Sequence, residues 1–131
     1  MLRTVLLRHT LTDGSAHFDW MLDLVGSGDD DTRSLRTFRV ALDAGRPDRD
    51  GAFEAELIPD HRRRYLWYEG PISGDRGDVR REAEGTFVLV RDQAARLRIV
   101  VDFGAGPIAW LGEPLGDGPV WRFTRDADTS R

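Results

Sequence analysis

The sequence predicts an all-β protein: a small closed or nearly closed antiparallel β-barrel with a ligand groove. Short β-rich or alternating runs recur along the chain, and few stretches have a helical period. Glycine and proline clusters separate these runs, as they do between antiparallel strands. About seven or eight strands at this spacing indicate a small barrel or a sandwich.

The first three strands are expected at residues 3–8, 18–25 and 35–42. The first contains an apolar run, the second stops at a Gly-Ser-Gly turn, and the third precedes a Gly-Arg-Pro turn. Between the second and third lies a polar acidic loop, residues 26–33, with three aspartates at its tip. We expect this loop to be mobile.

The later strands are expected at residues 64–68, 86–91, 97–103 and 120–124. Gly-Pro or Gly-rich turns follow residues 68 and 103, and another precedes residue 120. Residues 51–58 are ambiguous, because Ala-Phe-Glu-Ala-Glu-Leu suits either a helical turn or an edge strand. Residues 74–77, Gly-Asp-Arg-Gly, suit a plain tight turn or a turn whose backbone amides cradle an anion.

Composition indicates one domain, residues 1–125, followed by a tail at 126–131. The chain has no cysteine, which excludes disulfides, zinc fingers and a thiol nucleophile. No signal peptide and no membrane-length apolar run is recognisable, so we expect a cytoplasmic protein with no membrane partner.

The charge balance argues against a general nucleic-acid coat, because the net charge is −4 and the isoelectric point is about 5.3. It leaves room for a local basic patch. Every basic residue apart from histidine is arginine. Arginine presents a planar fork of donors to a phosphate, whereas lysine presents a point charge.

Two of the three histidines lie in a segment typical of a metal site. His9 ends an apolar run, a polar turn follows, and His17 and Asp19 come next at a spacing of two. In a strand that spacing puts both side chains on one face, and a hairpin would bring His9 back to them. Two imidazoles and a carboxylate suit Mn, Zn or Fe(II). The alternative is a polar rim at the end of a hairpin.

The third histidine, His61, lies far along the chain beside three consecutive arginines, 62–64, and Tyr65. A histidine among arginines, together with a separate metal-ligand cluster, indicates phosphate chemistry. A charge run of this kind is also common in a solvated loop.

Taken together, these residues resemble the 3′-phosphoesterase domain of bacterial DNA ligase D, in a stand-alone form. The resemblance rests on three segments: His9 followed by His17-Phe18-Asp19, Asp60-His61 with Tyr65, and Tyr68-Glu69-Gly70 before the Gly-x-x-Gly turn. It extends from Leu2 to about Arg125 and accounts for every histidine.

The resemblance implies a metal-dependent phosphoesterase that trims nucleic-acid 3′ ends, by removing a 3′-phosphate or a terminal ribonucleoside, with DNA repair proteins as partners. His9, His17 and Asp19 would hold a divalent metal, most often manganese, with zinc as the other candidate. His61 and Tyr65 would be catalytic. Apart from the resemblance, phosphate-binding arginines are expected among Arg36, Arg39, Arg62 and Arg64. Glu69 is either a carboxylate that orients a histidine from outside the ligand set or, in the favoured interpretation, a surface acid.

One departure stands out: the family has an arginine two residues after the metal-binding aspartate, and here that position is Met21. Because methionine cannot bind phosphate, we expect slow turnover, and Met21→Arg to raise it. Two alternative hypotheses remain open. The protein is either a non-catalytic barrel that binds metal or a phosphorylated ligand as an interaction module, or an enzyme that acts on a small phosphoester.

Overall fold

The computed structural model describes residues 1–49, 51–93 and 96–126 and confirms the predicted all-β barrel. The elements, in chain order, are β1 (Leu2–Thr10), β2 (Ala16–Asp23), β3 (Arg33–Ala41), β4 (Phe53–Arg62), the 3₁₀ helix η1 (Arg63–Leu66), β5 (Gly70–Pro71), β6 (Asp78–Gln93), β7 (Arg96–Asp102), β8 (Pro107–Pro114) and β9 (Val120–Arg125). All strand pairings are antiparallel.

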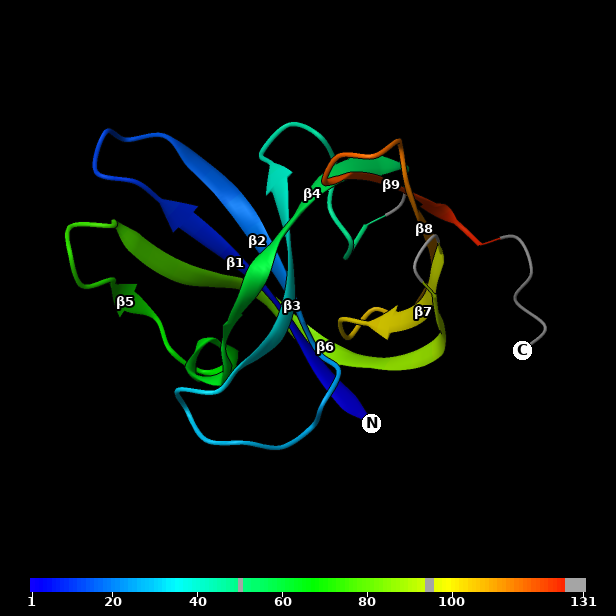
Figure 1. The fold of residues 1–131 in the computed structure, drawn as a ribbon, viewed down its shortest axis with the longest axis horizontal. Helices are drawn as coiled ribbons and strands as arrows, with labels where there is room; N and C mark the ends of the chain where they lie inside the picture. The colour runs from blue at the N-terminus through cyan, green and yellow to red at the C-terminus, as the bar shows by residue number, and fades with distance from the viewer. Residues whose placement is uncertain (50, 94–95, 127–131) are drawn as a thin grey trace.

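Eight of the strands form a closed ring in the order β1-β2-β3-β4-β9-β8-β7-β6, which returns to β1. The ring closes because β6 is long: its first part pairs with β1 and its last part with β7. Gly85 directly precedes the two residues that pair with both strands, and an added Cβ there would be 2.0 Å from the Asp102 carbonyl oxygen. Figure 1 shows the β1–β2 turn and the β5–β6 hairpin together on one side of the molecule, away from β7, β8 and β9.

Strands β1 to β3 bury side chains on both of their faces. Even-numbered residues such as Leu6, Trp20 and Phe38 point into the barrel, where they join a large aromatic core. Odd-numbered residues such as Leu7 and Met21 belong to a second apolar cluster on the outer face, which η1 and the segment after it cover. Figure 1 shows η1 beside these strands, outside the ring. The outer face is the one that carries the histidines.

Two expectations about individual elements were wrong, and one open alternative is decided. Residues 64–68 form no strand, because η1 turns the chain at 63–66 to cover the outer cluster. Strand β8 was missed, since it begins and ends at a proline and contains Gly112; an added Cβ at Gly112 would meet the Phe123 ring at 2.4 Å. The ambiguous segment 51–58 belongs mostly to β4.

The acidic loop between β2 and β3 is fastened to the start of η1. Asp23, which is buried, pairs with Arg63 at 2.7 Å and accepts a hydrogen bond from the backbone N–H of Gly26. Arg63 also donates to the carbonyl of Gly28, and Arg64 pairs with Asp31 at 2.7 Å. These bonds tie a loop that the sequence had indicated as mobile. Within the described residues, no helix has the length and apolar character required to cross a membrane. Of the tail expected at 126–131, residues 127–131 lie outside the described residues, and the backbone N–H of Asp126 donates to the carbonyl of Ala109.

Candidate metal centre

The pairing of β1 with β2 brings the three candidate metal ligands together. His9 and His17 are direct cross-strand partners. Asp19 follows His17 by two residues and therefore shares its face of the strand. The hairpin turn is held by Asp13, whose carboxylate accepts hydrogen bonds from both the N–H and the hydroxyl of Ser15. This fixed register confirms that both imidazoles and the carboxylate meet.

The ligand atoms are close enough to share one ion. Nδ1 of His9 lies 3.5 Å from one carboxylate oxygen of Asp19, and Nε2 of His17 lies 3.3 Å from the other. One ligand atom from each of the three residues can be chosen so that all lie within 4.8 Å of one another. An ion with bonds of about 2.0–2.2 Å to nitrogen and oxygen fits between atoms at this separation.

Two of these ligand atoms have no hydrogen-bond partner among the described residues. Asp19 is 2 % exposed, and its Oδ1 is buried without a hydrogen bond among the described residues. The same holds for Nε2 of His17. Buried polar atoms are normally satisfied, so two orphaned atoms that face each other are evidence for an absent partner. A divalent cation would satisfy both.

A backbone carbonyl orients the third ligand. Nε2 of His9 lies 2.8 Å from the carbonyl oxygen of Arg76, in the loop between β5 and β6. A carbonyl can only accept, so Nε2 must carry the hydrogen, and Nδ1 presents its lone pair to the site when the ring is neutral. Metal-bound histidines are usually oriented by a hydrogen bond of this kind.

The electrostatics of the centre suit a cation. Burial would raise the pKa of the Asp19 carboxyl, but the adjacent rings of His17 and His9 outweigh it and hold that pKa at about 2. The contact with Asp19 likewise raises the pKa of His9 above its ordinary value of 6.5, against the effect of burial. Asp19 is therefore ionised at neutral pH, as a ligand must be.

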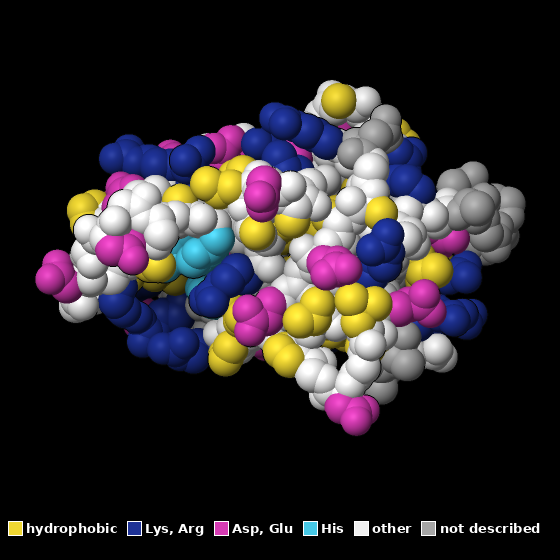
Figure 2. All heavy atoms as spheres, turned by 90° about the horizontal axis from the view of Figure 1, so that it is seen from above, with side chains coloured by type: hydrophobic (Ala, Val, Ile, Leu, Met, Phe, Trp, Pro, Cys, Tyr) yellow, Lys and Arg dark blue, Asp and Glu magenta, His cyan; other side chains and the backbone are white. Residues whose placement is uncertain are grey.

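His61 and Tyr65 face the same pocket as the metal-ligand cluster, although about 40 residues separate them from Asp19. The pocket, of about 310 Å³, is lined by His9 and Asp19 and also by His61 and Tyr65. The rings of His61 and Tyr65 lie 5.9 Å apart. Nδ1 of His61 is 2.9 Å from the carbonyl of Pro59, which fixes the hydrogen on Nδ1 and leaves Nε2 available. Figure 2 shows a histidine at the surface flanked by basic side chains.

The structure brings only some of the expected phosphate-binding arginines to this pocket. Arg39 and Arg62 line it, and Arg39 is the cross-strand partner of Asp19. Arg36 does not, because its even position puts it on the other face of β3, where it pairs with Asp92. Arg64 is likewise outside the lining and binds Asp31.

The expected orienting role of Glu69 also has no support in the contacts. Glu69 is exposed, and its carboxylate accepts a hydrogen bond from the backbone N–H of Arg81 at 2.7 Å. The group that orients a ligand is the Arg76 carbonyl.

Sequence reasoning assigned no role to three charged residues of the pocket: Arg33, Asp60 and Arg76. Arg33 is the cross-strand partner of Arg62, a relationship that could be found only once the β3–β4 register was known. Arg76 lies in the Gly-x-x-Gly turn, a pattern that indicates a use for the backbone amides and says nothing of this side chain. With these residues the pocket has four arginines against two aspartates, in a protein whose net charge is −4.

In comparisons with known proteins, no protein-family model matches the chain, and no curated protein has significant similarity to it.

Proposed function

We propose that the protein is a metal-dependent phosphoesterase that acts on nucleic-acid 3′ ends. One observation carries the proposal: a two-histidine, one-aspartate cluster opens into a pocket that also contains His61, Tyr65 and four arginines. A metal site, a potential proton donor and cationic side chains are the parts that phosphate-ester hydrolysis needs. The resemblance to the 3′-phosphoesterase domain of DNA ligase D supports the choice of substrate.

His9, His17 and Asp19 would hold the ion, with manganese as the first candidate and zinc as the second. When bound there, a divalent ion would polarise a phosphoryl oxygen and lower the pKa of a bound water. Asp19 supplies a negative charge, and the two rings supply neutral nitrogen ligands.

His61 is the group best placed to handle a proton. Its Nδ1 hydrogen is committed to the Pro59 carbonyl, so Nε2 is the atom that exchanges a proton with the substrate. A protonated Nε2 would donate to the leaving oxygen or stabilise charge on the phosphoryl group. Tyr65 packs on His61 from η1 and lines the same pocket.

The arginines provide the affinity for an anion. Neither Arg33 nor Arg39 has a side-chain hydrogen bond or ion pair with another described residue, and both are exposed at the pocket. Many other arginines in the described chain pair with a carboxylate, as Arg46 does with Asp48. Unpaired guanidinium groups beside a metal site are suited to a phosphate.

The test is phosphate release from a 3′-phosphorylated primer–template with Mn²⁺. Wild type is expected to release phosphate, His17→Ala to release none, and His61→Ala to be at least about 100-fold slower while it still binds Mn²⁺. A 5′-phosphorylated duplex is the control substrate. Turnover that survives His17→Ala would remove the proposal, and preference for a small phosphoester over the primer would change the substrate class.

Met21 favours a second candidate, a barrel that binds metal or a phosphorylated ligand without turnover. Its side chain is buried among apolar groups and offers the pocket no donor. Metal-dependent binding of the 3′-phosphorylated primer, without phosphate release from any substrate, would support this candidate over the enzyme.

A further inference from the structure

We propose that Arg76 and Arg62 form an anion clamp across the pocket, in place of the arginine that Met21 does not supply. The inference rests on the proposed function for the identity of its ligand, a phosphate group held beside the metal centre. It adds a residue, Arg76, and a structural device that holds it.

Arg76 reaches the pocket from the turn between β5 and β6. Its own carbonyl is bonded to His9, so the backbone of this residue lies against a metal ligand. Gly77 permits that approach: a Cβ there would lie 2.0 Å from the carbonyl oxygen of Thr10, and its φ is +90°. The Arg76 side chain is thereby anchored at the rim of the metal centre.

The guanidinium of Arg76 is held in place before any ligand arrives. Its Nε donates to the carbonyl of Ser73 at 2.7 Å, and Nη2 donates to the hydroxyl of the same residue at 3.3 Å. Two of the five N–H donors of the group are used in this way, and three remain. A pre-positioned guanidinium loses less side-chain entropy on binding than a free one.

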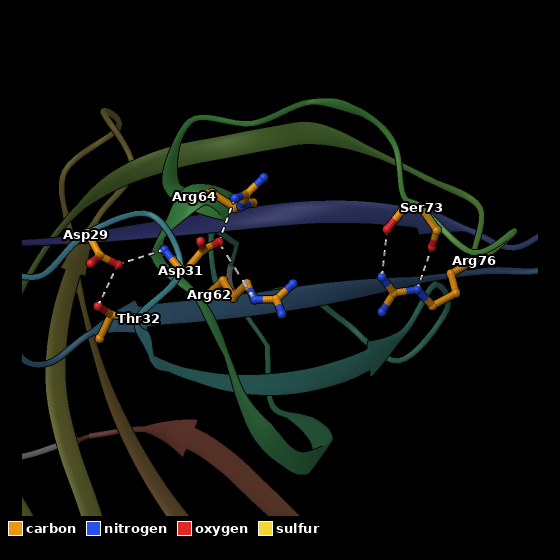
Figure 3. Close-up of polar contacts among 7 residues, drawn as sticks. All are labelled: Asp29, Asp31, Thr32, Arg62, Arg64, Ser73 and Arg76. Carbon is orange, nitrogen blue, oxygen red and sulfur yellow. Dashed lines mark hydrogen bonds and ion pairs between the residues drawn. The ribbon is translucent and has the colours of Figure 1, made fainter.

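Arg62 approaches from the end of β4, on the other side. Figure 3 shows the two guanidinium groups extending toward each other, Arg62 from the side of Asp31 and Arg76 from the side of Ser73. Nε of Arg62 is 4.0 Å from the Asp31 carboxylate, a loose ion pair, whereas Asp31 binds Arg64 at 2.7 Å. Asp31 thus satisfies Arg64 first and leaves the terminal nitrogens of Arg62 for a ligand.

Two facing guanidinium groups suit a phosphate monoester. Like charges that point at each other repel, and an anion between them removes the repulsion while it accepts hydrogen bonds from both. Each group can donate to a different phosphate oxygen, which leaves a third terminal oxygen for the metal. In this arrangement the phosphate affinity of the pocket would come from Arg76 and Arg62 and not from the residue at position 21.

The experiment is a titration of the metal-free, ¹⁵N-labelled protein with inorganic phosphate, at low ionic strength to limit screening. The variants are Arg76→Gln, Ser73→Ala and Arg80→Gln. Arg80→Gln is the matched control, because Arg80 is an exposed arginine on β6, paired with Asp78 and outside the pocket lining. Arg76→Gln removes the charge and keeps the backbone carbonyl that orients His9. Mn²⁺ affinity is measured separately for each variant.

We expect Arg76→Gln to weaken phosphate binding by about 10-fold or more, and Ser73→Ala by a smaller factor, with Arg80→Gln unchanged. Equal phosphate affinity in Arg76→Gln and Arg80→Gln would overturn the clamp, as would the absence of phosphate-induced shifts at Arg62 and Arg76. The titration contains no metal and no ester, so its result does not depend on metal binding or turnover. Failure to bind Mn²⁺ or to release phosphate would contradict the proposed function without contradicting the anion clamp.

Discussion

The rings of His9 and His17 lie edge to face, 4.9 Å between centroids, and belong to directly opposed residues of β1 and β2. Opposed residues in an antiparallel pair project from the same face, so a ligand pair of this kind is as rigid as the hairpin that carries it. A rigid site loses little entropy when it binds its ion.

Metal binding is expected to stabilise the fold. A ligand that binds only the native state adds about 2.7 kcal/mol at 100 times its dissociation constant, so saturating Mn²⁺ or Zn²⁺ should raise the midpoint of thermal unfolding. His17→Ala should abolish this rise, whereas His61→Ala should keep it. Calorimetric titration should give one ion per chain in wild type. A metal-induced rise of equal size in His17→Ala would place the ion elsewhere.

The pH dependence of this stabilisation follows from the two shifted groups. Asp19, with its lowered pKa, contributes stability above its ordinary 3.8 and loses it as the pH falls toward about 2. His9, with its raised pKa, contributes below 6.5 and loses that contribution as the pH rises through the raised value. The metal-free protein should therefore gain most from this pair between pH 3.8 and 6.5.

With metal present, stability should rise instead of fall as the pH increases through the pKa of His9, because a bound ion requires neutral histidine. The rise in unfolding temperature caused by Mn²⁺ should be small at about pH 5.5 and should grow toward about pH 7.5. Thermal scans with and without metal at both values measure it. A rise that is independent of pH would mean that His9 is not a ligand.

Met21→Arg is expected to destabilise the protein, contrary to the gain in activity that the sequence indicated. Met21 is 1 % exposed and packs in the outer apolar cluster with Leu35 and Leu66. An arginine there would bury an unpaired charge, and we expect a loss of about 2 kcal/mol or more in the free energy of unfolding. Met21→Leu, which conserves volume, should cost less than about 1.5 kcal/mol. Urea titration distinguishes them, and a stable, faster Met21→Arg would show that the pocket can take the cation.

Gly77→Ala should impair the metal site through the carbonyl of Arg76. The new Cβ would force the turn away from Thr10 and lengthen the hydrogen bond to His9. Loss of an orienting partner typically lowers metal affinity about 10–100-fold. Gly74→Ala is the control: it also has a positive φ in this turn, but its nearest contact is 3.7 Å away, on a flexible side chain. If the two variants bind Mn²⁺ equally, the carbonyl does not matter to the site.

The buried pair of Asp23 and Arg63 should matter to stability and not to metal binding. Asp23→Asn leaves a mostly buried guanidinium without its counter-charge, and we expect a loss of about 2–3 kcal/mol in the free energy of unfolding. Asp92→Asn breaks the more exposed pair with Arg36 and should cost less than about 1 kcal/mol. Equal losses would show that burial does not govern these pairs.

The residues that could be predicted from the sequence are those whose placement follows from a short segment. His17 and Asp19 share a face by strand geometry alone, and a hairpin returns His9 to them. Arg36 and Arg39 show the limit, because only the phase of β3 decides which of two nearby arginines faces the pocket, and that phase is set by Phe38 in the barrel. The resemblance to a known domain grouped His61 with the metal-ligand cluster. In the structure, β4 carries His61 and η1 carries Tyr65 to the pocket that the cluster also lines.

The alternation of faces along β2 separates the parts of this protein that selection can change from those that it cannot. Phe18, Trp20 and Leu22 fill the barrel, while His17 and Asp19 project from the outer face of the same strand. Exchange of the second set alters chemistry and leaves the barrel interior intact. A lineage could therefore lose, retune or regain the metal centre through single substitutions while it kept one fold.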